Sequence, residues 1–152
     1  MKGRKGFTLI EAIVILIIVA VLSSLALHSY SRWKLKTEVE RDVRTLETTI
    51  NKLRMEAFSR KRSYKLEIVD KSLTVKDAST DEVLYTYQLL TPFGSSSGGR
   101  VTFTIDRKGI ISVRRNIISK VRGISSLNPD FDCISVGKTY VRVGRWNGTA
   151  CK

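Results

Sequence analysis

The strongest feature in the alternation of hydrophobic and polar positions is one long apolar run near the start of the chain. Residues 7–27 read FTLIEAIVILIIVAVLSSLAL and hold a single charged side chain, Glu11. At about 1.5 Å per residue, a helix of this length spans the roughly 30 Å hydrocarbon core of a bilayer. Residues 1–6 carry three basic side chains and no acidic ones. The pattern therefore predicts a cytoplasmic N-terminus and a large C-terminal part across the membrane.

Two ordinary interpretations fit this run. It is either a single-pass anchor or a secretory signal that is cleaved near Ser24 to Ala26. Glu11 argues against both, because a carboxylate inside a membrane costs about 2.5 to 3.5 kcal/mol on insertion scales and requires a partner. The pattern alone leaves both interpretations open.

A second helical stretch follows over residues 28–62, with no helix breaker before Ser63. Its apolar residues recur at alternating steps of four and three, at Val39, Val43, Leu46, Ile50, Leu53 and Ala57. The helix is therefore amphipathic, and its stripe must pack against something. We expect it to cover the chain's own sheet rather than form a coiled coil, because the heptad pattern lasts for fewer than three repeats.

From Tyr64 onward the period changes to two, which is typical of strands. Strands are predicted at 65–69, 72–76, 83–89, 101–105, 110–114, 133–136 and 139–143, with turns at Asp70-Lys71, 78–82 and 106–109. These patterns predict an α+β fold, in which a long N-terminal helix packs on a mainly antiparallel sheet within residues 63–152. The GSSSGG stretch at 94–99 lacks the Gly-Lys-Ser/Thr ending and the following helix of a phosphate loop, so we expect a flexible surface loop.

Composition limits the function classes. The chain has 152 residues, enough for one domain, and a formal charge of +13, of which residues 100–152 supply 11 basic and 3 acidic side chains. Polyanions are therefore the first partners to consider. One His and two Cys predict no metal site and no cofactor. A catalytic triad would need His28, and Asp130 and Asp132 lie in an expected loop, so we do not expect an enzyme.

The N-terminal string KGFTLIEAIVILIIVAVLSSLAL resembles the N-terminus of type IV pilins and of type II secretion pseudopilins. The resemblance rests on a basic leader, residues 1–6, that ends in Gly6, on the aromatic Phe7, and on Glu11 as the fifth residue after Gly6. It implies that a prepilin peptidase cuts between Gly6 and Phe7 and methylates the new amine of Phe7. Glu11 then pairs with that amine on a neighbouring subunit.

The same resemblance implies a location and a set of partners. The chain would sit in the bacterial inner membrane, with its C-terminal domain in the periplasm, and then join other pilins or pseudopilins in a filament whose core is the helix of residues 7–27. Many pilins have a proline near position 28, where this sequence has His28. We interpret His28 as an ordinary polar residue at the membrane boundary.

The C-terminal string CISVGKTYVRVGRWNGTAC resembles the closing segment of GspH/FimT-type pilin-like proteins. In that family two cysteines bracket the last strand pair, which implies a disulfide between Cys133 and Cys151. Two buried free thiols remain the alternative. A disulfide closing this loop would stabilise the fold by about 3 kcal/mol on an entropic model.

FimT-type members include minor pilins that bind DNA through a Gly-Arg-x-Arg element and serve natural transformation. This sequence lacks that string, and the resemblance carries over approximately to Lys138, Arg142 and Arg145. Four further cations could extend the surface: Arg114, Arg115, Lys120 and Arg122. The predicted function is a DNA-binding minor pilin that contacts double-stranded DNA without sequence preference. The alternatives are a solvated basic face and a GspH-like pseudopilin with a structural role in secretion.

Overall fold

The computed structural model describes residues 8–152, except for the side chains of residues 24–28. The chain forms two units, which divide between Leu35 and Lys36. One helix, α1, runs from Leu9 to Arg60. Among the described residues, no helix meets the length and hydropathy required to cross a membrane.

The second unit contains a six-stranded sheet in the order β3-β1-β2-β4-β5-β6, in which every neighbouring pair is antiparallel. The α+β fold predicted from the sequence is confirmed. A single helical turn, α2 (Ile124–Leu127), precedes β5. The strands are β1 (Tyr64–Asp77), β2 (Val83–Ser95), β3 (Arg100–Ile105), β4 (Arg115–Ser119), β5 (Cys133–Val136) and β6 (Val141–Gly144).

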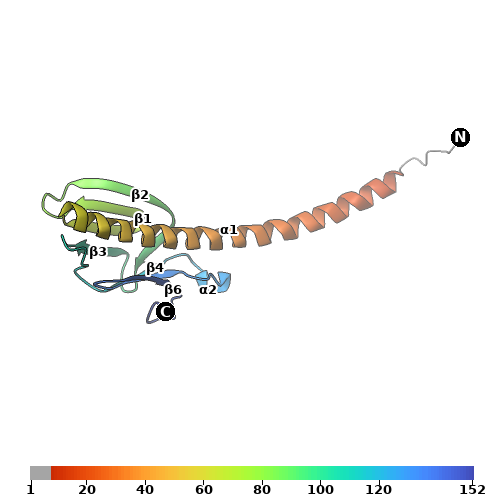
Figure 1. Cartoon of the computed structure of the whole chain (residues 1–152). Coiled ribbons are helices and arrows are strands. Elements are labelled where there is room, and N and C mark those ends of the chain that lie inside the picture. Colours follow the sequence, from red (N-terminus) through yellow and green to blue (C-terminus); the bar gives the residue numbers. More distant parts are fainter. Residues whose placement is uncertain (1–7) are drawn as a thin grey trace. The chain divides into compact units, whose positions relative to one another are not determined.

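The core of this unit lies between the sheet and the second half of α1, which crosses the sheet in Figure 1. Every member of the predicted stripe is buried: Val39, Val43, Leu46, Ile50, Leu53 and Ala57. The alternate residues of β1 and β3 that meet the stripe include Leu66, Ile68 and Phe103. The helix therefore packs on its own sheet, as its spacing predicts.

One buried polar contact fixes the helix against β2. Asp42 lies on α1 and is almost fully buried. Its Oδ2 accepts hydrogen bonds from the backbone N–H and the hydroxyl of Thr91, both at 2.7 Å. Because an unpartnered buried carboxylate is costly, the pair favours one placement of α1 along the sheet.

The predicted turn at Asp70-Lys71 is wrong. These residues lie inside β1, where the pairing register shifts between Asp70 and Ser72 and Asp70 adopts a φ of 54°. The first half of β1 pairs with β3, whereas the second half pairs with β2. The local pattern resembled a turn because the strand has a bulge where it changes partner.

The predicted strand at 110–114 is also wrong. Within this stretch Ile111 makes only an isolated bridge to Ile105, and its N–H donates to the Lys138 carbonyl at 2.9 Å. The strand is β4, which begins at Arg115. Ile111 is buried as a single core residue, and this mimics the start of an alternating pattern. Turns do occur at 78–82 and 106–109, as predicted.

Replacement of Leu46 by Ala should lower the free energy of unfolding by about 2 to 5 kcal/mol, because it leaves a cavity beneath α1. The test protein is a fragment that begins at Lys36, which contains every core residue. Denaturant unfolding measures the change. The matched control is Met55→Ala on the same helix, whose side chain is 68% exposed, and it should change stability by about 0.5 kcal/mol or less. Equal losses of unfolding free energy in both variants would contradict the packing of Leu46 against the sheet.

Candidate filament and polyanion sites

The first candidate site is the start of α1. Thr8 precedes the helix, and its hydroxyl accepts the backbone N–H of Glu11 at 3.3 Å. Thr8 is therefore the N-cap, and Glu11 stands three residues later, at the capping-box spacing. The carboxylate of Glu11 is exposed in the first turn, where the helix dipole favours negative charge. Thr8 is not among the predicted site residues, although Thr-x-x-Glu is a recognisable helix-start signal.

The predicted cleavage residues Gly6 and Phe7 lie outside the described residues. The first two turns of α1 that follow them present apolar side chains to solvent, with Leu9 79% and Ile10 72% exposed. The same holds along the helix for Ile13, Leu16, Ile17 and Leu22. A helix with large apolar side chains exposed in this way requires another apolar environment to cover it.

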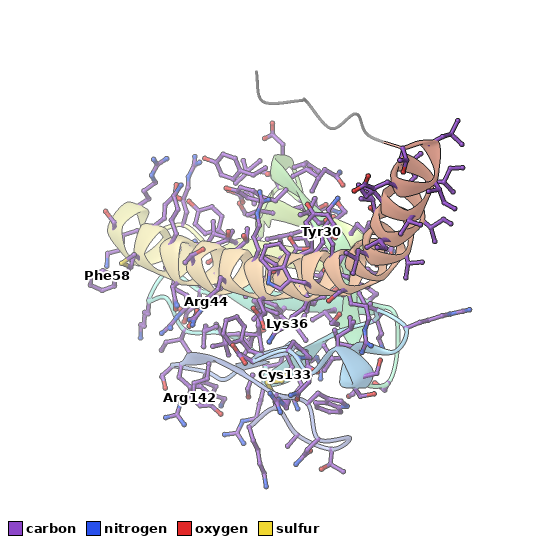
Figure 2. The ribbon with its side chains drawn as sticks, turned by 90° about the vertical axis from the view of Figure 1, so that its right-hand side faces the viewer. Tyr30, Lys36, Arg44, Phe58, Cys133 and Arg142 are labelled. Carbon is purple, nitrogen blue, oxygen red and sulfur yellow. A yellow bond between two sulfur atoms is a disulfide. The ribbon has the colours of Figure 1, made fainter. Side chains whose placement is uncertain are left out.

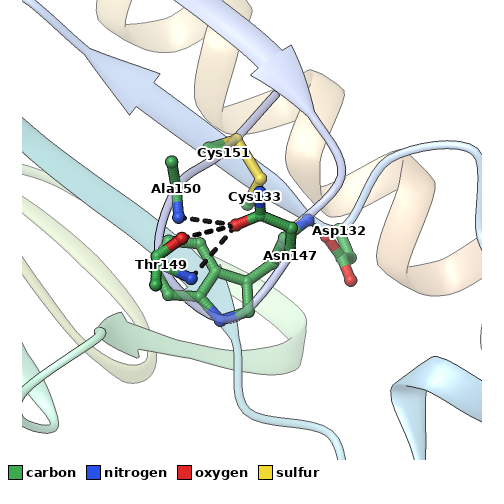
Figure 3. Close-up of a disulfide and its surroundings, with 7 residues drawn as sticks. Asp132, Cys133, Asn147, Thr149, Ala150 and Cys151 are labelled. Atoms are coloured by element: carbon green, nitrogen blue, oxygen red, sulfur yellow. Dashed lines mark hydrogen bonds between the residues drawn. A yellow bond between two sulfur atoms is a disulfide. The ribbon is translucent and has the colours of Figure 1, made fainter.

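The second candidate site is the C-terminal segment, which a disulfide between Cys133 and Cys151 closes against β5 (Figure 3). The predicted pairing is thus the one present in the structure. Within the loop, Asn147 Oδ1 accepts hydrogen bonds from the N–H groups of Thr149 and Ala150 at 3.1 and 2.8 Å. These bonds turn the chain so that Cys151 returns to β5 (Figure 3).

Asp132 ties this segment to the sheet. Its carboxylate is buried and accepts the backbone N–H of Trp146 at 2.7 Å. Its own N–H donates to the Gly144 carbonyl at 3.0 Å. Arg145 and Lys152 then pair through their backbones, with N···O distances of 2.7 and 3.1 Å. Asp132, which the sequence placed in a loop, is therefore a structural acceptor.

The three predicted DNA-binding cations lie along β6, which is one of the two edge strands of the sheet. Lys138 lies in the hairpin before β6, Arg142 within it and Arg145 directly after it. All three residues are exposed, and Figure 2 shows Arg142 on the side of β6 away from α1. Its guanidinium lies 5.0 Å from the centre of the Tyr140 ring, a cation–π contact that orients it.

Strand register divides the predicted cations into two groups. Arg115 is the Cα partner of Val136, so Arg114 and Arg115 lie at the same end of the sheet as the hairpin of Lys138. At the opposite end, the Ser119 N–H donates to Asp132 and the Asp132 N–H to Gly144. Lys120 and Arg122 therefore lie near the end that carries Arg145, and Arg142 stands between the groups.

Arg145 already has a role within the fold. Its Nη2 donates to the Pro129 carbonyl at 2.7 Å. The guanidinium therefore holds the connection before β5 as well as carrying charge. Lys138 and Arg142 are the better reporters of binding to an external polyanion, because their replacement breaks no hydrogen bond of this kind.

Arg54 is a further positioning residue, and the sequence held no signal for it. From α1 its Nε donates to the Gly109 carbonyl at 3.0 Å and its Nη2 to the Thr139 carbonyl at 2.9 Å. One guanidinium thus holds both the turn after β3 and the hairpin before β6. The position of Lys138 depends on this contact.

Two comparisons with known proteins gave matches to this chain. Residues 1–27 match the prokaryotic N-terminal methylation motif. The chain is also similar to two fimbrial proteins of Pseudomonas aeruginosa, each 28% identical over 126 residues, which cover 71% of this chain and 82% of the relative. The chain is type IV pilin-like. No solved structure matches it significantly.

In this pilin-like chain, the methylation motif includes Gly6, Phe7 and Glu11. Thr8, the N-cap of α1, lies between them. Helix initiation and the matched motif therefore occupy the same few residues.

Replacement of Gly144 by Ala should loosen the C-terminal segment, because a Cβ at this position would collide with the backbone carbonyl of Lys152. We expect the free energy of unfolding to fall by about 1 to 3 kcal/mol. Amide exchange at Arg145 and Lys152 should accelerate as well. The control is Gly98→Ala, where a Cβ would meet no atom within 4 Å. If Gly144→Ala matches this control in both measurements, the close approach at Gly144 is not tight.

Proposed function

We propose that this chain is a minor subunit of a type IV pilus that binds extracellular double-stranded DNA for uptake. The observation that carries the proposal is the exposed apolar surface of α1 within the residues that match the methylation motif. Such a surface is suited first to the membrane and then to the apolar core of a filament of pilins. The membership of the GspH/FimT type is part of the proposal, supported by the disulfide-closed segment around β6.

Processing would convert the N-terminus into an assembly element. Residues 1–6 form the leader, and the peptidase cuts after Gly6 to release the amine of Phe7. Residues 7–27 then act as the membrane and filament-core helix, and residues 28–62 carry the domain of residues 63–152. Glu11 pairs with the Phe7 amine of a neighbouring subunit, which provides the partner that a carboxylate in an apolar environment requires. Its exposed position in the first turn leaves it accessible to that amine.

Substitution of Gly6 by Leu should block processing, because a bulky side chain replaces the unhindered backbone at the cut. In cells that contain a prepilin peptidase, mass spectrometry should detect full-length chains that begin at Met1 and carry no N-methyl-phenylalanine. The control is Gly3→Leu, which alters the same leader away from the cut and should leave processing unchanged. Mature chains of normal mass from Gly6→Leu would refute the assignment of the cleavage site.

The DNA-binding part of the proposal depends on charge along β6. Lys138 and Arg142 can each neutralise a backbone phosphate and release a bound counterion, which gives affinity without sequence preference. The positive electrostatic potential at the two ends of this strand would be raised further by Arg145, Arg114 and Arg115. Because the cations follow one edge of the sheet, they could track a phosphate backbone without penetrating a groove.

The double substitution Lys138→Gln/Arg142→Gln should weaken DNA binding about tenfold at low salt and should lower the slope of log affinity against log salt by about 2. The measurement uses the full chain in uncharged detergent and a duplex of mixed sequence. The control, Lys52→Gln/Lys71→Gln, removes equal charge from exposed positions on α1 and β1. Equal loss of DNA affinity in both variants would show that binding depends on total charge alone. It would refute a DNA-binding site along β6.

The second candidate function is a pseudopilin of a secretion system with a structural role. Two observations favour it: the Gly-Arg-x-Arg string is absent, and Arg145 holds the fold. It shares the processing and assembly steps given above. Absence of DNA binding at low salt, with normal processing, would select this function over DNA uptake.

A further inference from the structure

A polar groove that does not include β6 lies at the connection between β2 and β3. It has a volume of about 340 Å³ and is lined by Ser95, Ser97, Gly98, Arg100, Thr102 and Arg115. This is the glycine- and serine-rich stretch that the sequence predicted as a flexible loop. In the structure Gly94 and Ser95 belong to β2, and a short turn connects them to β3. Every lining side chain carries a hydrogen-bond donor, and none is acidic.

The charge in the groove comes from two strands that do not neighbour each other in the sheet. Arg100 begins β3 and Arg115 begins β4. The Nε of Arg100 contacts the Glu67 carboxylate at 3.1 Å, and Lys76 contacts the same carboxylate at 3.2 Å. Within residues 8–152, Arg115 has no ion pair at all. Arg100 and Lys76 together share the single negative charge of Glu67, and Arg115 is unpaired in the part of the chain that the structure describes. The groove therefore keeps a net positive charge.

Small polar groups surround these cations. The hydroxyls of Ser95 and Ser97 lie 3.4 Å apart, and the Ser97 N–H is 3.4 Å from the Ser95 hydroxyl. These contacts are long, so both serines retain capacity for a stronger partner. Thr102 adds a third hydroxyl from β3.

The glycines of the turn have no explanation inside the fold. A Cβ added at Gly98 or Gly99 would meet no atom within 4 Å, and neither residue has a positive φ. Packing and backbone conformation would therefore accept alanine at both positions. Glycine is also used where a ligand approaches the backbone closely, and Gly98 lines the groove.

We propose that this groove binds the oxyanion of a phosphate group. Arginine guanidinium groups recognise phosphate oxygens through charge-assisted hydrogen bonds, which supply the attraction. The serine and threonine hydroxyls supply further donors around the anion, and Gly98 leaves room for it against the backbone. The phosphate is either inorganic phosphate or a phosphodiester of a nucleic acid strand. The proposal rests on this groove, which shares Arg115 with the proposed DNA-binding surface but includes neither Lys138 nor Arg142.

The test titrates inorganic phosphate into the full chain in uncharged detergent, with chloride exchanged to hold ionic strength constant. Backbone amide resonances of Ser97, Gly98 and Arg115 should shift together and saturate. Arg115→Gln should lower the phosphate affinity about tenfold, because it removes a charge-assisted contact. The matched control is Arg122→Gln, which removes the same charge from an exposed position that does not line the groove, and it should leave the affinity unchanged.

Gly98→Ala separates ligand binding from folding. The substitution should leave the thermal unfolding midpoint in chloride unchanged or slightly raised, and it should lower the phosphate affinity. Equal affinities in the wild type, Arg115→Gln and Gly98→Ala would overturn the proposal. So would amide shifts that do not localise to the groove.

A parallel titration with dimethyl phosphate identifies the source of the anion. Saturable shifts of the same amides by both ligands support a phosphodiester. Saturation by inorganic phosphate alone supports a free phosphate. DNA binding along β6 is tested separately, by substitution of Lys138 and Arg142, which lie outside the groove. Failure of that test therefore leaves the result of the phosphate titrations unchanged.

Discussion

Burial of one apolar stripe of α1 against the sheet is the interaction on which the rest of this domain depends. Most of the large buried side chains of β1, β3, β4 and β5 belong to the same cluster as the stripe. The stripe thus decides which face of each strand turns inward, and a register slip of one residue would expose that face. Asp42 and Arg54 then use the same helix to hold β2 and two turns at set positions.

The C-terminal segment is held at the end of β6, an edge strand of the sheet. The disulfide, the buried carboxylate of Asp132 and the backbone pair of Arg145 and Lys152 close the chain against this end of the sheet. Gly144 permits the close approach because it has no Cβ. The three cations along β6 lie within the loop that the disulfide closes. Stability and the proposed recognition of polyanions therefore share one element.

Sequence patterns predicted the helix, its buried stripe, the antiparallel sheet and two of the turns, because each depends on residues close together in the chain. They failed at Asp70-Lys71, where β1 exchanges one partner strand for another, and at residues 110–114, where a single buried isoleucine imitates a strand. In both places the outcome depends on which distant strand supplies the hydrogen bonds. The N-cap role of Thr8 was readable from the sequence and was missed, whereas the contacts of Arg54 span more than 50 residues and left no local signal.

The sequence by itself determined the pilin-like N-terminus, because a methylation motif is a string of contiguous residues and its chemistry needs no distant contact. It also determined that the C-terminal third is basic. Only the tertiary structure decided what each cation does. Arg145 donates to Pro129, Arg142 lies over Tyr140, and Arg115 lines the same groove as Arg100. The physical reason is that charge is a property of composition, whereas the partner of a charge is set by strand order and register.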